Sequence, residues 1–207
     1  DTLMTEGVIW KQLILFSVPL LIGNLFQQFY NLVDSVVVGN FVGKEALAAV
    51  GSTGTIINTL IGFFLGLSMG GNVVVSQYFG AKDDRGVHDA LHTTLFITLA
   101  LSVFFTIAGY FMVPNMLRLM STPSDVFEEA KVYLQIYFIG ISGLMVYNMG
   151  SGILRAVGNS RYPLYFLILS AVLNIILDLV FVLLFGMGVA GVAYATIISQ
   201  FISAILI

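Results

Sequence analysis

The chain has 207 residues, of which 58% are hydrophobic and only 9% are charged, and its net charge at pH 7 is −3. Soluble domains average about 25% charged residues, so the composition argues against a soluble enzyme, and the small, unclustered charge argues against a nucleic-acid partner. Cysteine is absent, which excludes disulfides and Cys-based metal sites. We therefore predict an integral membrane protein.

Six apolar stretches are long enough to cross a bilayer as helices, for which about 20 residues are needed. Alternation with a period of two, which is typical of a transmembrane barrel, is absent. The predicted spans are roughly 12–38, 49–79, 90–113, 126–150, 163–185 and 188–207. We therefore expect an all-α fold of six transmembrane helices.

Basic residues set the expected orientation because they gather on the cytoplasmic side of a membrane. With six crossings, more basic residues lie on the side of the two chain ends than on the other side. Those on the side of the ends are Lys11, Lys82, Arg85, Arg155 and Arg161, and those opposite are Lys44, Arg118 and Lys131. We expect a multi-pass protein of the plasma (inner) membrane, with both ends of this chain in the cytoplasm.

Two acidic residues, Asp34 and Asp178, lie well inside predicted spans. A carboxylate at mid-bilayer costs at least about 2.5–3.5 kcal/mol on insertion scales. We expect no interior Lys or Arg in the spans, so a simple buried salt bridge is disfavoured. A site or relay is therefore favoured over the structural alternative, in which both acids serve as caps or interhelical contacts.

Polar residues around these acids recur at three- and four-residue steps, which places them on one face of each helix. They are Asn24, Gln27, Gln28, Asn31, Asp34 and Ser35 in the first span, Ser170, Asn174 and Asp178 in the fifth, and Thr196, Ser199, Gln200 and Ser203 in the sixth. Lipid does not tolerate such stripes, so they must face each other or a water-filled cavity. Our candidates for the lining of a substrate cavity on the first span are Asn24, Gln27, Gln28 and Asn31.

Four polar residues on three helices are expected at similar depths in the membrane, which suggests a cation site. Asp178 lies eight residues before Gly186, and Thr196 lies eight residues after Gly188, so both sit about 12 Å below the same outer loop. Asn174 is one turn deeper, and Asp34 is in the outer half of its span. We predict that Asp34, Asn174, Asp178 and Thr196 bind Na⁺ or H⁺, because hard oxygen groups suit these ions and the His and Cys ligands of zinc are missing.

Each of three further residues has two possible roles, one functional and one structural. Pro19 removes a backbone hydrogen bond in the first span and is either a hinge or a static kink. Asn72 in the second span could line the cavity or bond between helices. Tyr137 in the fourth span could stack on a cationic substrate or fill the bundle.

Several motifs resemble those of one transporter family. They are Pro19 to Asn24 (PLLIGN), Val33 to Ser35 (VDS), Gly43 to Gly51 (GKEALAAVG), Gln77 to Lys82 (QYFGAK), Leu154 to Arg161 (LRAVGNSR) and Gly188 to Ala193 (GVAGVA). Together they resemble the N-terminal half of the MATE (multidrug and toxic compound extrusion) transporters, and the similarity covers nearly all of the chain.

The resemblance implies a cation-coupled antiporter with two six-helix lobes that exports organic cations and other amphipathic drugs by alternating access. Residues 1–207 would form the N-terminal lobe, and the second lobe would come from the same native chain or from a second copy. In the similar family branch an acid on the first helix, Asn-x-x-x-Asp on the fifth and Thr on the sixth bind the cation. These match Asp34, Asn174, Asp178 and Thr196. The resemblance implies no cofactor beyond the coupling ion, and no enzyme activity.

Other functions fit less well. A flippase or exporter of a lipid-linked or other narrow metabolite from the same superfamily is the alternative, but a pyrophosphate substrate would be expected to need a basic cavity. An intramembrane aspartyl protease would need a motif such as Gly-x-Gly-Asp, which neither acid has. Two unpaired acids argue against a passive scaffold.

Overall fold

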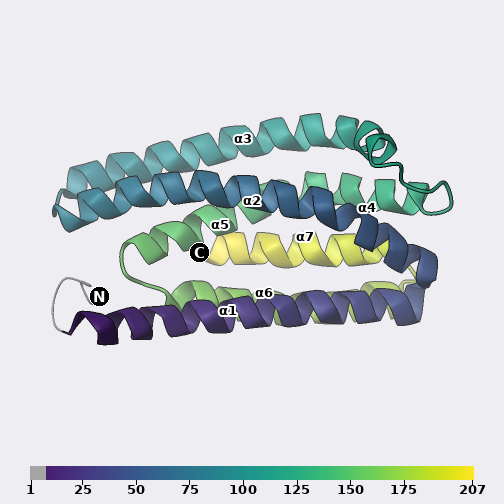
Figure 1. The fold of residues 1–207 in the computed structure, drawn as a ribbon, viewed down its shortest axis with the longest axis horizontal. Helices are drawn as coiled ribbons and strands as arrows, with labels where there is room; N and C mark the ends of the chain where they lie inside the picture. The colour runs from purple at the N-terminus through teal and green to yellow at the C-terminus, as the bar shows by residue number, and fades with distance from the viewer. Residues whose placement is uncertain (1–7) are drawn as a thin grey trace.

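Long helices make up almost all of residues 8–207, which are the residues that the computed structural model describes (Figure 1). The α-helices are α1 (Ile9–Val37), α2 (Lys44–Gly80), α3 (Asp84–Leu119), α4 (Phe127–Ile139), α5 (Ile141–Ala156), α6 (Arg161–Leu179) and α7 (Gly188–Leu206). Two short π-helical segments, η1 (Val38–Val42) and η2 (Val180–Leu184), continue α1 and α6. No strand occurs in the described range, so the all-α prediction is confirmed. Residues 1–7 of the predicted lobe, with the predicted cytoplasmic amino-terminal end, lie outside this range.

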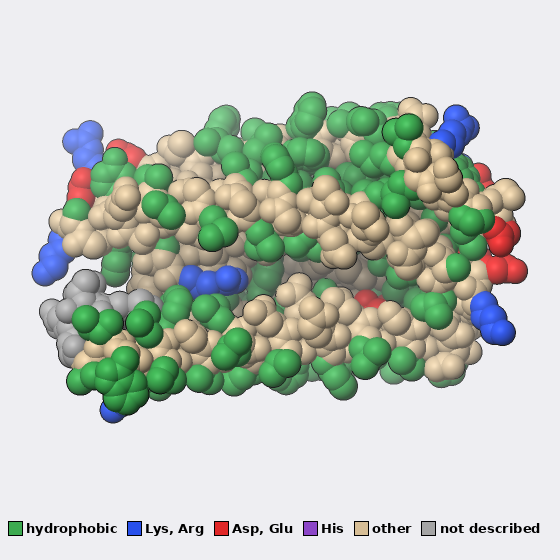
Figure 2. All heavy atoms as spheres, viewed as in Figure 1, with side chains coloured by type: hydrophobic (Ala, Val, Ile, Leu, Met, Phe, Trp, Pro, Cys, Tyr) green, Lys and Arg blue, Asp and Glu red, His purple; other side chains and the backbone are tan. Residues whose placement is uncertain are grey.

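The helices have the length and apolarity of membrane spans. Five segments pass this test alone, and α4 and α5 together form a sixth span that is bent by 50°. Figure 2 shows charged side chains gathered mainly at the two ends of the long axis, with hydrophobic side chains spread between them. The chain is therefore a multi-pass membrane protein, and counting the bent pair α4–α5 as one span gives the six spans that the sequence predicted.

Most helices extend beyond the predicted spans. The second begins at Lys44 rather than near residue 49, and the third covers Asp84–Leu119 rather than 90–113, with Pro114 inside it. The start of α3 is capped by the carboxylate of Asp83, which accepts a hydrogen bond of 3.0 Å from the backbone N–H of Gly86. Hydropathy marks only the apolar part of a helix, so it misses polar turns that stay helical outside the hydrocarbon.

The fourth predicted span, 126–150, is interrupted at Gly140. A methyl group at this position would collide with the side chain of Ile197, so glycine allows α4 and α5 to approach α7 closely where they meet. The backbone N–H of Gly140 is shared between the carbonyls of Ile136 and Tyr137, at 3.2 and 3.1 Å. The bend follows from this close contact, which one helix read alone does not reveal.

The helices pack in three layers. Figure 1 shows α2 and α3 on one side, α1 and α6 on the other, and α4, α5 and α7 between them. The middle layer holds much of the core, which includes Leu134, Phe138 and Ile141. By contrast, α1 buries only Gly23 and Val37 and packs mainly against α6 and η1. It is the span least covered by the rest of the chain.

Candidate functional site: a polar cavity beside two facing carboxyl groups

Two carboxyl groups face each other inside the bundle. Asp34 lies in the last turn of α1 and Asp178 in the last turn of α6, and their side chains are close enough to interact with each other. Asp178 is fully buried. Among residues 8–207, no donor reaches either carboxyl oxygen of Asp178 or Oδ1 of Asp34. Two carboxylates this close repel each other unless a proton or a cation lies between them.

The amide and hydroxyl predicted to join this pair lie beside it. Asn174 is one helical turn before Asp178 on α6, and its Nδ2 lies 3.5 Å from Oγ1 of Thr196 on α7. That hydroxyl donates to the backbone carbonyl of Val192 at 3.0 Å. Both side chains are buried, and Oδ1 of Asn174 has no donor in the described range. The group therefore offers several unsatisfied oxygens, as a proton or a small hard cation requires.

A π-helical turn follows each of the two acids, and neither turn was predicted. Val38, the first residue of η1, comes four residues after Asp34, and Val180, the first of η2, comes two residues after Asp178. The wider winding is marked by backbone bonds across five residues, from Gly43 to Val38 at 3.0 Å and from Phe185 to Val180 at 3.2 Å. The two segments contact each other. Such turns are rare in proteins overall, and those that occur are often found at functional sites.

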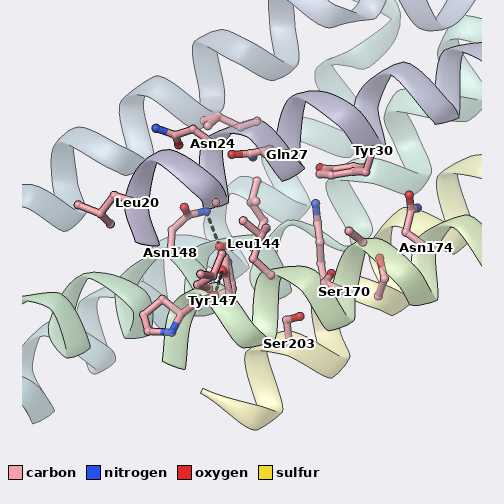
Figure 3. Close-up of a pocket in the computed structure, with 18 of the residues that line it drawn as sticks. Leu20, Asn24, Gln27, Tyr30, Leu144, Tyr147, Asn148, Ser170, Asn174 and Ser203 are labelled. Atoms are coloured by element: carbon pink, nitrogen blue, oxygen red, sulfur yellow. Dashed lines mark hydrogen bonds between the residues drawn. The ribbon is translucent and has the colours of Figure 1, made fainter. Parts of the chain in front are cut away.

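A cavity of about 260 Å³ lies next to this group, between α1, α2, α5, α6 and α7. Apolar side chains such as Leu20 and Leu144 form part of its wall. Its polar lining, drawn in Figure 3, includes Asn24, Gln27, Tyr30, Asn148, Ser170 and Asn174. Thr196 also lines it, whereas Asp34 and Asp178 do not. Asn174 and Thr196 are therefore the wall that the cavity shares with the carboxyl pair.

The polar stripe of α1 is divided between two directions. Asn24 and Gln27 line the cavity, whereas Gln28 and Asn31 are exposed and do not line it. Adjacent helical residues differ by about 100° around the axis, so a stripe this wide cannot face one cavity. Tyr30, which the sequence analysis did not select, lies on the inward side and interacts with Gln27.

Asn72 and Tyr137 lie outside the cavity lining. The side chain of Asn72 donates to Oγ of Ser68 at 3.3 Å and packs against Gly152 of α5. Tyr137 is buried in α4, where it stacks on Tyr133 with 6.5 Å between ring centroids. Its side chain interacts with Gln200, which lines the cavity. Tyr137 therefore lies one layer behind the wall.

Pro19 lies inside α1 and lines the cavity at the end remote from Asp34. The two residues are fifteen positions apart, or about 22 Å along a helix. Helix α1 continues on both sides of Pro19. The hinge stays a prediction.

Arg155 corrects the expectation that the spans hold no interior basic residue. From the sequence, Arg155 is expected beyond the fourth span, on the side of the chain ends, but it is part of α5 and lines the cavity. A signal was present, because Tyr147, Ser151 and Arg155 stand at i, i+4 and i+8 and so share one helical face. The prediction failed because the predicted fourth span ended too early, at residue 150.

Known proteins share this sequence and fold. The MatE family model matches residues 19–180. The probable multidrug resistance protein YpnP of Bacillus subtilis is 41% identical over 196 residues, which is 95% of this chain and 44% of that protein. A crystal structure of MATE in the bent conformation superimposes with a TM-score of 0.90 at 31% identity, over 97% of this chain and 44% of that one.

A second solved structure, the outward-facing conformation of a multidrug resistance MATE family transporter of the MOP superfamily, gives a TM-score of 0.86 at 32% identity. The match covers 94% of this chain and 43% of the chain of that transporter. The chain thus spans less than half the length of these relatives. No group of three or more His, Cys, Asp or Glu that could hold a metal occurs in residues 8–207. The chain belongs to the MATE family, whose members are membrane transporters rather than enzymes.

Proposed function

We propose that this chain forms the N-terminal lobe of an antiporter that exports organic cations and amphipathic drugs in exchange for Na⁺ or H⁺. The observation that carries the proposal is the carboxyl pair of Asp34 and Asp178. Three of its four oxygens have no donor among residues 8–207, and the pair shares the wall of Asn174 and Thr196 with the cavity. An ion bound at the pair and a substrate bound in the cavity would both contact this wall.

The proposed coupling between ion binding and substrate export depends on the two acids being on different helices. Asp34 is on α1 and Asp178 on α6, so a proton or cation between them favours close approach of these helices, and its loss favours their separation. Because α1 packs mainly on α6 and η1, its position is sensitive to that balance. An ion can shift such an equilibrium only by its differential affinity for the two states. A bend at Pro19 would convert the shift into a change of cavity shape.

A second lobe would complete the cavity. The exposed polar side chains of Gln28 and Asn31 do not line the cavity and are poorly suited to lipid. They fit a surface against another lobe, supplied by the same native chain or by a second copy. The bias of basic residues supports an orientation in the inner membrane with both ends of this chain in the cytoplasm.

Dye efflux from pump-deficient cells that express the native full-length frame tests the proposal. We expect a cationic dye to be exported, and export to collapse when the Na⁺ gradient or the proton gradient is removed. Asp125→Asn is the matched control for Asp178→Asn, because Asp125 is exposed in the turn before α4. Equal efflux by the Asp178→Asn variant and the wild type would refute the assignment of the ion site.

The alternative is a flippase or exporter of a lipid-linked or other narrow metabolite. Arg155 in the cavity lining favours it to a degree, because a pyrophosphate group needs basic partners. It is the only Lys or Arg in that lining, whereas a pyrophosphate carries more than one negative charge. Export of the cationic dye would decide against this alternative.

A further inference from the structure

Arg155 gives the cavity a basic end. It belongs to the last turn of α5 and lines the cavity together with Pro19 and Ser160. Asn174 and Thr196 line the cavity where it adjoins the acids. From Pro163, which also lines it, to Asp178 is fifteen residues of α6, or about 22 Å. Figure 2 shows a hollow with basic atoms toward one end and acidic atoms toward the other.

The guanidinium of Arg155 has no acidic partner in the part of the chain that the structure describes. Among residues 8–207, no carboxylate lies within 4.0 Å of it, and the two ion pairs in this range join other residues. Its Nε is buried and has no acceptor in the same range. A charged group inside a membrane protein is costly to keep without a counter-ion. An anion that enters the cavity would supply one.

The neighbours of Arg155 suit an acidic group carried on an apolar body. Tyr147, two turns earlier on α5, lies near Arg155, and its hydroxyl donates to the carbonyl of Pro163 at 3.0 Å, which ties α5 to the start of α6. Asn24 also lines this cavity with its amide, and Leu20 and Leu164 contribute apolar surface to the wall. A guanidinium held at a rigid helix junction can bind a carboxylate or phosphate in a bidentate manner.

We propose that Arg155 is a specificity-determining residue that binds the acidic group of a zwitterionic amphiphile. The carboxylate or phosphate of the substrate contacts the guanidinium, the apolar body lies along Leu20 and Leu164, and the amine points toward Asn174. The inference deepens the proposed export function and rests on it. A purely cationic substrate makes the same contacts except the one to Arg155.

The test is binding of two matched xanthene dyes to the purified native full-length protein, followed by fluorescence anisotropy. One dye is a zwitterion with a free carboxylate, and the other is its ethyl ester, which is a cation. Loss of one charge-assisted contact predicts that Arg155→Gln weakens binding of the zwitterion about tenfold or more. Binding of the ester should change by less than about twofold, and Arg155→Lys should recover part of the loss.

Arg161→Gln is the matched control, because Arg161 is an exposed basic residue at the start of α6 that does not line the cavity. It should leave both dyes unaffected. If Arg155→Gln weakens the binding of both dyes equally, Arg155 acts on the fold or on the second lobe, and the inference is overturned. If the wild type binds the ester but not the zwitterion, the inference fails while the proposed function stands. If it binds neither dye, both fail.

A lipid phosphate has the same chemistry as a substrate carboxylate, so a competition arm separates the two sources. The competitor is short-chain phosphatidylglycerol. If it displaces the zwitterion from the wild type but does not displace the zwitterion that Arg155→Gln still binds, the site accepts phosphates as well. Absence of displacement assigns it to the acidic group of the exported amphiphile. In both cases the dependence on Arg155 supports the inference.

Discussion

Nδ2 of Asn174 lies 3.5 Å from Oγ1 of Thr196, and these two side chains form the wall between the cavity and the carboxyl groups of Asp34 and Asp178. They are the only members of the predicted ion group that line the cavity. An ion that draws in the unpaired Oδ1 of Asn174 would therefore alter the surface that a substrate meets. This contact gives a physical route from ion to substrate.

Replacing Asp178 by Asn should abolish stabilisation by the coupling ion. An ion that binds only the folded protein adds about 2.7 kcal/mol of stability at a hundred times its dissociation constant. The wild type should show this increase in thermal unfolding as Na⁺ is added or the pH is lowered, and Asp178→Asn should not. Asp125→Asn should behave like the wild type. A variant that keeps the full increase would remove Asp178 from the site.

Thr196 can be tested by near-isosteric changes. Thr196→Val removes the hydroxyl that contacts Asn174 and keeps the shape, whereas Thr196→Ser keeps the hydroxyl. If the hydroxyl oxygen of Thr196 binds the ion, Thr196→Val should lower the apparent ion affinity about tenfold. Thr196→Ser should change it about threefold at most. Titration of ion-dependent transport measures both. Equal affinities for the two variants would show that Thr196 serves packing alone.

Pro19→Ala tests the hinge. Alanine restores a backbone donor and removes the ring that weakens the helix, which favours a straight α1. We expect the turnover of transport to fall about tenfold while ion binding, measured by thermal unfolding, stays as in the wild type. Unchanged turnover would mean that the proline is a static feature of the helix.

Gly140→Ala tests the close approach of the bent span to α7. The added methyl group would meet Ile197, and such overpacking typically costs about 1–3 kcal/mol. Gly66→Ala is the control, because nothing lies within 4 Å of a side-chain carbon at Gly66 in α2, and it should gain about 0.5–1 kcal/mol from helix propensity. Thermal unfolding of the native frame in detergent compares them. Equal stabilities would contradict the packing described for the bend.

The sequence predicts much of this architecture because hydropathy reports directly on which residues lie in hydrocarbon. It predicts the spans and, through the spacing along two helices, the shared depth of Asp178 and Thr196. It does not reveal the bend at Gly140, where α4 and α5 meet α7 closely, or the π-helical turns after Asp34 and Asp178. Hydrophobic patterns carry no record of such contacts.

The site was predictable where one helical face carried the signal, and less so where side-chain direction mattered. Gln27 and Gln28 are equivalent in a list of polar residues, but only the first lines the cavity. The sequence places Arg155 outside the fourth span because a basic residue beyond an apolar stretch normally lies in water. The packing of α5 against α6 and α7 brings it to the cavity instead.

The most direct test of the central claim is counter-transport by the native full-length protein in proteoliposomes. Export of a cationic dye should drive uptake of Na⁺ or H⁺ in a fixed ratio, and Asp178→Asn should abolish the ion flux while Asp125→Asn leaves it unchanged. Dye export that proceeds with no ion flux in the wild type, or with the same ion flux in Asp178→Asn, would contradict the account.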